Sequence, residues 1–321
     1  MREHGGNLDL AQQRFGGRAE DWIDLSTGIN RRPYPVGEIS ARHWQALPSR
    51  SEIEALHQAA QRAYGTIAPV VATGGAQAAI QLLPQLAPRG RARILGPTYN
   101  EYAAVLSAAG WEVEEVGELD ALAGASLAIV VNPNNPDGRR ASSKELLALL
   151  PRVGHLVVDE SFADAVPELS LTSEAGRPGL LILRSFGKFY GLAGLRLGFS
   201  IGHATDIAKL AAASGPWPVS GAAIAIGCRA LRDDAWAKAT SARLVRDGAR
   251  LDDMVQSQGW RLLGSAPLFR LYETPDGRAA QEKLARNQIW SRVFAQDRTW
   301  LRLGLPGAES EWRRLAEVLA R

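Results

Sequence analysis

The sequence predicts an α/β protein in which a mostly parallel sheet lies between helices, followed by a small α+β domain. From residue 69 onward, short apolar runs alternate with helix-like stretches, which is typical of parallel strands joined by helical crossovers. The runs are nearly continuous in Val, Ile and Leu, as expected for strands buried on both faces. After about residue 260 the pattern changes to short strands around one or two helices.

The predicted elements follow one another along the chain. The expected strands are VVAT ending at Thr73, ARILG (92–96), WEVEEVG, SLAIVVN (126–132), HLVVDES (155–161), LLILRSF (180–186) and LRLGFSI (195–201). The expected helices between them are GAQAAIQLLPQLA, YNEYAAVLSAAG and KELLALL. A helical region follows residue 203 and is broken at Pro216-Trp217-Pro218. It continues as a long helix in which apolar residues recur at intervals of three and four residues. We expect this helix to connect two domains.

Three segments are therefore expected. Residues 1–35, with little periodicity, form an N-terminal arm that joins the small domain. Residues 36–230 form the large domain, and residues 231–321 form the small C-terminal domain, with the short strands WRLLGSAPLFRLYE, QIWSRVFAQ and TWLRLGLP.

Composition narrows the class of protein. The chain has 321 residues, and its 37 Lys and Arg against 34 Asp and Glu are scattered, which argues against nucleic acid as a partner. One cysteine, Cys228, excludes an internal disulfide and a multi-cysteine zinc site, and no metal is expected. The polar start and the shortness of the apolar runs predict neither a secretory signal nor a membrane span, so we expect a cytoplasmic protein.

The polar residues directly after the predicted strands are the candidates for chemistry, because ligands of such sheets bind at the carboxyl ends of strands. Lys188 lies in SFGKFYGLAGLRLGF, three residues after Ser185 and eight before Arg196. This spacing suits a lysine that forms a Schiff base with pyridoxal phosphate, while the hydroxyl and guanidinium hold the phosphate. A lone lysine in a loop would more simply be a surface residue.

Other strand ends offer matching groups, each with a simpler structural interpretation. Asp159 suits the pyridine nitrogen, which needs a carboxylate to stay protonated, but it also suits a helix N-cap. The loop with Asn135 reads as overlapping Asn-Pro turns, yet it can aim an amide at the cofactor's phenolic oxygen. Gly75 and Ala76 at a helix start can bind phosphate through backbone amides, and Tyr99 can stack on a flat ring or simply pack.

In this order the motifs resemble the aspartate aminotransferase (class I/II) superfamily of pyridoxal phosphate enzymes, with the fold of type I transferases. Within it, the chain resembles the family of threonine-phosphate decarboxylases, which act in cobalamin biosynthesis. The resemblance covers nearly the whole chain through HGGN (4–7), DLSTGIN (24–30), GPTY (96–99), VNPNNPDGR (131–139), VVDESFAD (157–164), LRSFGKFYGLAGLRLGF (183–199) and WLRLGLP (300–306).

The resemblance implies a role for each matching residue. Lys188 would carry the cofactor, Asp159 would face the pyridine nitrogen and Asn135 the phenolic oxygen. The phosphate would lie on Gly75, Ala76, Ser185 and Arg196, with Tyr99 on the ring and Tyr64 reaching across from a second subunit of a homodimer. Arg302 would take the substrate's carboxylate, and Arg292, His4 and Asn30 would lie near its phosphate.

Two departures leave alternatives open. Aminotransferases of the superfamily have Asp-x-x-Tyr where this chain has Asp159 and Phe162, and relatives of the branch usually read Ile-Asn-Pro where it has Ile29-Asn30-Arg31. The expected reaction is decarboxylation of L-threonine O-3-phosphate to (R)-1-amino-2-propanol O-2-phosphate, and the alternative is a histidinol-phosphate-type aminotransferase. A catalytically silent protein of this fold conflicts with the intact residue set, and a nicotinamide oxidoreductase would need a glycine fingerprint that is missing.

Overall fold

The computed structural model describes residues 4–320 of the chain. Contacts divide the chain into two compact units, described here in turn. The large unit comprises Tyr34–Asn135 and Arg140–Lys238, and the small unit comprises the described part of Met1–Pro33 with Pro136–Arg139 and Ala239–Arg321. Within residues 4–320, every helix is too short or too polar to cross a membrane.

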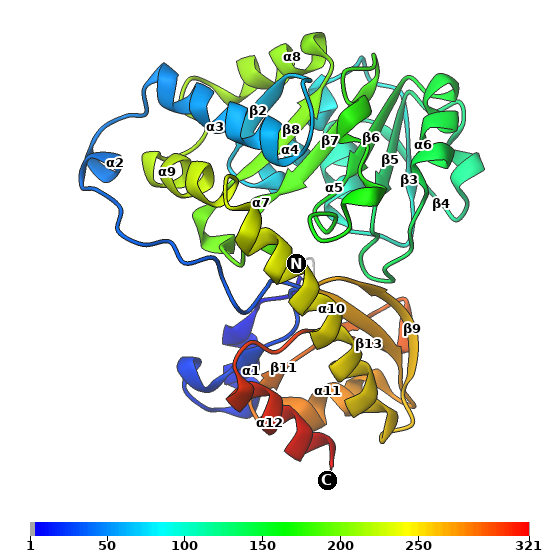
Figure 1. Ribbon diagram of the computed structural model, residues 1–321. Coiled ribbons are helices and arrows are strands. Elements are labelled where there is room, and N and C mark those ends of the chain that lie inside the picture. Colours follow the sequence, from blue (N-terminus) through cyan, green and yellow to red (C-terminus); the bar gives the residue numbers. More distant parts are fainter. Residues whose placement is uncertain (1–3, 321) are drawn as a thin grey trace. The chain divides into compact units, whose positions relative to one another are not determined.

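The large unit is built on a seven-stranded sheet (Figure 1). Its spatial order is β2 (Val70–Thr73), β8 (Gly198–Gly202), β7 (Leu180–Ser185), β6 (His155–Asp159), β5 (Leu127–Val131), β3 (Arg91–Leu95) and β4 (Glu112–Val116). The five strands from β7 to β4 are parallel, and β8 is antiparallel to both of its neighbours. The predicted mostly parallel sheet is confirmed, and each of its seven strands overlaps a predicted run.

Helices lie along both faces of this sheet (Figure 1). They are α3 (Arg50–Ala63), α4 (Ala76–Leu82), α5 (Glu101–Ala108), α6 (Ser143–Leu149), α7 (Phe186–Phe189), α8 (Ala204–Ser214) and α9 (Gly221–Ala230), preceded by the short α2 (Arg42–Gln45). Capping boxes start two of them: Ser49 with Glu52 at α3, and Ser142 with Glu145 at α6.

The core of the large unit explains why the strand runs are apolar throughout. Ile80 of α4, Leu106 of α5 and Leu210 of α8 join Ile129 and Val157 of the central strands in one buried cluster. Burying each such side chain contributes about 1.5–3 kcal/mol, so this layer holds the strand ends of the unit in place.

The small unit has two sheets. An antiparallel sheet has the order β12 (Arg292–Phe294), β13 (Asp297–Gly304), β10 (Phe269–Glu273) and β9 (Arg261–Ala266), and a second pairs β1 (Ile23–Asp24) in parallel with β11 (Ile289–Trp290). Its helices are α1 (Leu8–Phe15), α11 (Gly277–Ala285), α12 (Glu309–Leu319) and most of the 23-residue α10 (Asp234–Gln256), which begins in the large unit. The predicted small α+β fold is confirmed.

The N-terminal arm, whose sequence shows little periodicity, nevertheless contains the helix α1. The side chain of Asn7 accepts a hydrogen bond from the amide of Leu10 and caps the helix at its start. Ala11 is fully buried in a cluster with Trp22, Ala285 and Trp290, and the last two lie far along the chain from the helix. A pattern of only eight residues is too short for its apolar face to be recognised without those partners.

Candidate functional site

Asp159 ends β6 with its carboxylate held at both oxygens. Its Oδ2 accepts a hydrogen bond of 2.6 Å from the hydroxyl of Tyr102, and its Oδ1 accepts one of 2.8 Å from the amide of Ser161. Asp159 is 4% exposed and Tyr102 is completely buried in α5. A buried carboxylate held in this way is oriented before any ligand arrives, which suits a group that must face one ring atom.

Tyr102 is a site residue that the sequence did not reveal. It lies in the run YNEYAAVLSAAG, where an aromatic residue in an apolar helix reads as core. Tyr99, the predicted tyrosine, lies beside it with ring centroids 6.3 Å apart, and its hydroxyl donates to Oε1 of Gln77 at 3.1 Å. Gln77 in turn donates to a carboxylate oxygen of Glu101 at 3.2 Å, so the Tyr99 ring is held by a chain of polar contacts.

Lys188 follows β7 directly, in the short helix α7, and is only partly exposed. Its Nζ lies 5.5 Å from the centroid of the Phe162 ring. Phe162 is 5% exposed, so the residue that departs from Asp-x-x-Tyr packs beside the candidate Schiff-base lysine. Lys188 is therefore not the surface lysine of the simpler interpretation.

Three strand ends bring the candidate phosphate residues to one edge of the sheet. Gly198 of β8 pairs with Thr73 of β2 on one side and with Ser185 of β7 on the other. A Cβ on Gly198 would lie 2.5 Å from the amide nitrogen of Ala76, so only glycine lets the start of α4 approach so closely. Ser185, Ala76 and the adjoining Gly75 therefore lie at the same edge.

Gly75 also leaves room for Arg196. Gly75 has φ 81° and ψ 166°, a backbone conformation that is almost restricted to glycine, and a Cβ there would lie 2.7 Å from Nη2 of Arg196. Arg196 itself has φ 54°, and its Nη1 donates to the carbonyl oxygen of Ala193 at 3.0 Å. The glycine backbone and the guanidinium together form a cradle, defined here as Gly75 and Arg196, whose positive charge suits a phosphate group.

In the Asn-Pro loop after β5, the three asparagines differ in their burial and in their hydrogen-bond partners. Asn132 is fully buried and exchanges two hydrogen bonds with the backbone of Ala141. Asn134 donates to the carbonyl oxygen of Pro97 and accepts from the hydroxyl of Thr98 at 2.6 Å. Asn135, the predicted cofactor residue, comes next and is partly exposed at the carboxyl end of β5.

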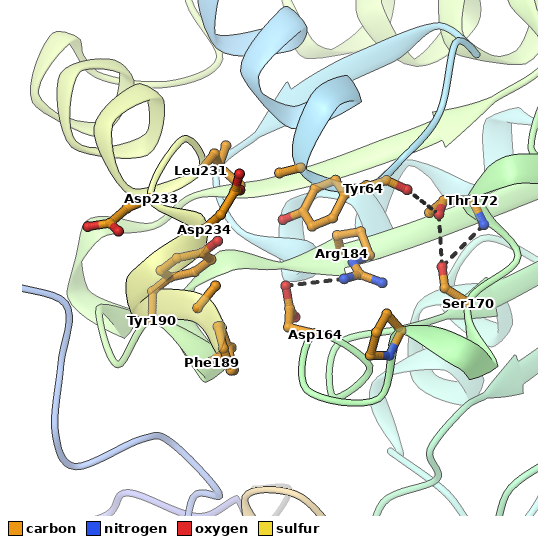
Figure 2. Close-up of a pocket in the computed structure, with 13 residues that line it drawn as sticks. Tyr64, Asp164, Ser170, Thr172, Arg184, Phe189, Tyr190, Leu231, Asp233 and Asp234 are labelled. Atoms are coloured by element: carbon orange, nitrogen blue, oxygen red, sulfur yellow. Dashed lines mark hydrogen bonds and ion pairs between the residues drawn. The ribbon is translucent and has the colours of Figure 1, made fainter. Parts of the chain in front are cut away.

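Tyr64 lies away from these candidate cofactor residues in its contacts, because it lines a cavity of about 130 Å³ in the large unit (Figure 2). Its ring stacks under the guanidinium of Arg184 at 4.3 Å, its side chain is 8% exposed overall, and burial raises the pKa of its hydroxyl. Arg184 binds Glu160 at 2.7 Å and Asp164 at 3.1 Å. A ring buried among groups of its own chain gives no support to a role at a partner's cofactor, which stays a prediction.

In the small unit, Arg292 and Arg302 are directly opposite each other on β12 and β13. Both guanidinium groups lie over the ring of Phe294, at 5.5 and 5.7 Å, and Nη2 of Arg302 donates to the carbonyl oxygen of Ser26 at 2.5 Å. Burial, together with the positive charge of Arg292, lowers the pKa of Arg302 to about 9 against the opposing effect of Asp24. Two neighbouring cations, one of them buried, are an arrangement that an anionic ligand stabilises.

The predicted arm residues are also placed. Asn30 is 3% exposed, and its Oδ1 accepts hydrogen bonds from Nη2 of Arg243 at 2.8 Å and from the amide of Arg32 at 3.0 Å. Arg31, the other departure, pairs with Glu311 through two hydrogen bonds. His4 is exposed. Arg243 was not found from sequence, because it reads as one more charged residue on a long helix.

Comparison with known proteins agrees with this picture. The chain matches the family Aminotransferase class I and II over residues 38–319. It is 45% identical over 327 residues to a threonine-phosphate decarboxylase of Sinorhizobium sp and 41% identical over 326 residues to one of Pseudomonas aeruginosa, in each case over 99% of this chain and 97% of the relative. A histidinol-phosphate aminotransferase of Mycobacterium bovis is 32% identical over 85% of this chain and 78% of its own length.

Solved structures share the fold at lower identity. The structure of histidinol-phosphate aminotransferase from Sinorhizobium meliloti in complex with pyridoxal-5'-phosphate has a TM-score of 0.82 and 19% identity, covering 97% of this chain and 94% of that chain. The seven-stranded sheet, the residues at its edge and these similarities lead to one conclusion: the chain belongs to the aminotransferase class I and II family of pyridoxal phosphate enzymes.

Proposed function

We propose that this protein is a pyridoxal phosphate-dependent lyase that converts L-threonine O-3-phosphate to (R)-1-amino-2-propanol O-2-phosphate and carbon dioxide, a reaction of cobalamin biosynthesis. One observation carries the proposal: relatives named threonine-phosphate decarboxylase are 41–45% identical over almost the entire chain. The histidinol-phosphate aminotransferase relative is less similar and covers less of the chain.

The large unit supplies a fitting site for the cofactor. When bound, pyridoxal phosphate supplies an aldehyde for the substrate amine and a ring that accepts electrons from the bond being broken. The space that a Cβ on Gly75 would fill beside Arg196, and the oriented carboxylate of Asp159, fit its two ends. The residues that would hold it are Lys188 at the aldehyde, Asp159 at the ring nitrogen, Asn135 at the phenolic oxygen, Tyr99 on the ring, and Gly75, Ala76, Ser185 and Arg196 at the phosphate.

The small unit supplies the groups for an anionic substrate. Threonine phosphate carries a carboxylate and a phosphate, and Arg302 and Arg292 are two adjacent cations that suit one anionic group each. We assign the carboxylate to Arg302 and the phosphate to Arg292, with Asn30 and His4 as further phosphate contacts.

Two anchors also explain how the protein would select decarboxylation. A substrate held at one end can rotate, whereas one held at carboxylate and phosphate has the bonds at its Cα fixed in direction. We propose that the two anchors hold the substrate so that the bond between Cα and its carboxylate is the one that breaks. Lys188 would hold the cofactor aldehyde through its amine, and the same amine would donate the proton that Cα needs once carbon dioxide has left.

The alternative, a histidinol-phosphate-type aminotransferase, differs in a measurable product. The purified holoenzyme is given carboxyl-labelled threonine phosphate without a ketoacid, and in parallel histidinol phosphate with 2-oxoglutarate. Release of labelled carbon dioxide without a ketoacid is the expected result. No release, together with rapid formation of glutamate from 2-oxoglutarate, would establish the alternative.

We also propose that the protein works as a homodimer. Trp44 is 68%, Leu47 65% and Trp217 54% exposed. Trp44 and Leu47 lie in or just after α2, and Trp217 precedes α9, and these two helices are in close contact: a Cβ on Gly221 at the start of α9 would lie 2.5 Å from the carbonyl oxygen of His43 in α2. We place the contact at this surface, while the role of Tyr64 at a partner's cofactor stays a prediction, and Trp44→Glu is expected to yield a monomer in sedimentation analysis. An unchanged dimer would place the interface elsewhere.

A further inference from the structure

The arm is here residues 24–33 of the N-terminal segment. It is hydrogen-bonded to β13, the strand that carries Arg302. The amide of Gly304 donates to the carbonyl oxygen of Leu25 at 2.6 Å, and Arg302 donates to that of Ser26. Any change in the position of this arm therefore changes the surroundings of Arg302 as well as the position of Asn30.

One carboxylate, that of Glu311 in the first turn of α12, holds this arm. Nε of Arg31 donates to its Oε2 at 2.9 Å and Nη2 to its Oε1 at 2.5 Å, which is the two-pronged geometry that makes guanidinium pairs strong. The two side chains are only 24% and 18% exposed, so water screens this pair less than a surface pair. Burial opposes ionisation, yet Arg31 and the amide of Gly307 hold the pKa of Glu311 below its ordinary value.

The same carboxylate also holds the loop that follows β13. Oε2 of Glu311 accepts a hydrogen bond of 2.6 Å from the amide of Gly307. A Cβ on Gly307 would lie 2.6 Å from the carbonyl oxygen of Arg31, and Nε of Arg32 donates to the Gly307 carbonyl oxygen at 2.6 Å. Arm and loop are thus in direct backbone contact, and Glu311 is the side chain that binds both.

This contact determines how Asn30 is presented. Asn30 directly precedes Arg31, and both hydrogen bonds to its Oδ1 come from groups of the same unit, the amide of Arg32 and the guanidinium of Arg243. With the oxygen engaged there, the orientation of the side-chain amide is defined. This orientation depends on the backbone of residues 30–32 staying in place.

We propose that Glu311 is a positioning residue for the reaction: through Arg31 and Gly307 it fixes the arm, and thereby the position of Asn30 and of the Ser26 carbonyl that holds Arg302. The part of this statement that concerns substrate rests on the function proposed above. The part that concerns the arm does not, and can be measured without substrate.

The chain offers a matched control on the same helix. Glu309 pairs with Arg250 in the same two-pronged way, but the two side chains are 59% and 43% exposed, and Arg32 acts on Glu309 only through its charge, as a smaller cause than Arg250. We therefore compare Glu311→Gln with Glu309→Gln, using hydrogen exchange of residues 25–32 and the kcat and KM for threonine phosphate. Arg31→Gln and the double variant with Glu311→Gln complete a double-mutant cycle.

Glu311→Gln is expected to speed exchange of the arm about tenfold, since it weakens charge-assisted hydrogen bonds that hold it, and to raise KM by a similar factor. Glu309→Gln is expected to stay within about twofold in both measurements. The double variant should change exchange and KM no more than Glu311→Gln alone, because Glu311→Gln already removes the ion pair with Arg31.

Equal exchange in Glu311→Gln and Glu309→Gln overturns the proposal, whatever the enzyme's reaction. A faster arm with unchanged KM and kcat shows that arm position does not control the substrate site, and equally overturns it. Failure of the proposed function is distinct, since it appears in the unaltered enzyme as no carbon dioxide release while the exchange comparison still reports on Glu311. Thermal unfolding of each variant verifies that it is folded.

Discussion

Replacing Arg302 by lysine tests whether this guanidinium binds the carboxylate of the substrate. Arg302 is 4% exposed, lies opposite Arg292, and is oriented by its hydrogen bond to Ser26 and by the rings of Phe269 and Phe294. Lysine presents a single amine where arginine presents two parallel N–H groups to a carboxylate.

The expected magnitude follows from that difference. Losing one charge-assisted hydrogen bond costs about 1.5–3 kcal/mol, which is about a 10- to 150-fold decrease in kcat/KM for threonine phosphate. Because the lost contact orients the bond that breaks, kcat should fall as well as 1/KM. Arg298→Lys, at an exposed position of the same strand, is the control and should stay within about twofold.

The assay separates the two anchors by using a ligand with only one of them. Aminopropanol phosphate has the phosphate and the amine but no carboxylate, so its inhibition constant should be nearly unchanged in Arg302→Lys. In Arg292→Lys, by contrast, the inhibition constant of aminopropanol phosphate should rise, because lysine cannot make the two-pronged contact to phosphate that we assign to Arg292. If Arg302→Lys weakened aminopropanol phosphate as much as threonine phosphate, or left kcat/KM for threonine phosphate unaltered, the assignment of Arg302 to the carboxylate would be refuted.

Three further predictions concern the cofactor edge of the large unit. Lys188→Ala should lose the yellow colour of the holoenzyme, because only an amine forms the bond to the cofactor aldehyde; colour that survives dialysis would contradict this. Gly75→Ala should lower the free energy of unfolding by about 1–3 kcal/mol and weaken cofactor binding in a fluorescence titration, since its Cβ meets Arg196; normal affinity would argue against the cradle. Tyr102→Phe should lower the free energy of urea unfolding by about 1–3 kcal/mol, because buried Asp159 loses a donor; an unchanged midpoint would show that this bond contributes nothing.

Much of the large unit was determined locally by the sequence. The apolar runs that end at Thr73, Val131, Asp159 and Ser185 are strands because continuous Val, Ile and Leu are stable only when both faces are covered. Since parallel strands end at one edge, the sequence alone predicts that the polar residues after these runs lie together. The family resemblance then assigned them roles.

The tertiary structure alone decided which partners each of these residues has. Tyr102 donates to a carboxylate 57 residues away, Arg243 reaches Asn30 across 213 residues, and Arg31 meets Glu311 across 280. The local sequence pattern around these residues does not predict such pairs, because helix and strand periodicities show which face of an element is apolar and not which distant residues that face contacts. For the same reason the sequence left α1 unrecognised and could not show that Tyr64 is buried in its own chain: a short helix and a single aromatic ring acquire their environment only when distant segments pack on them.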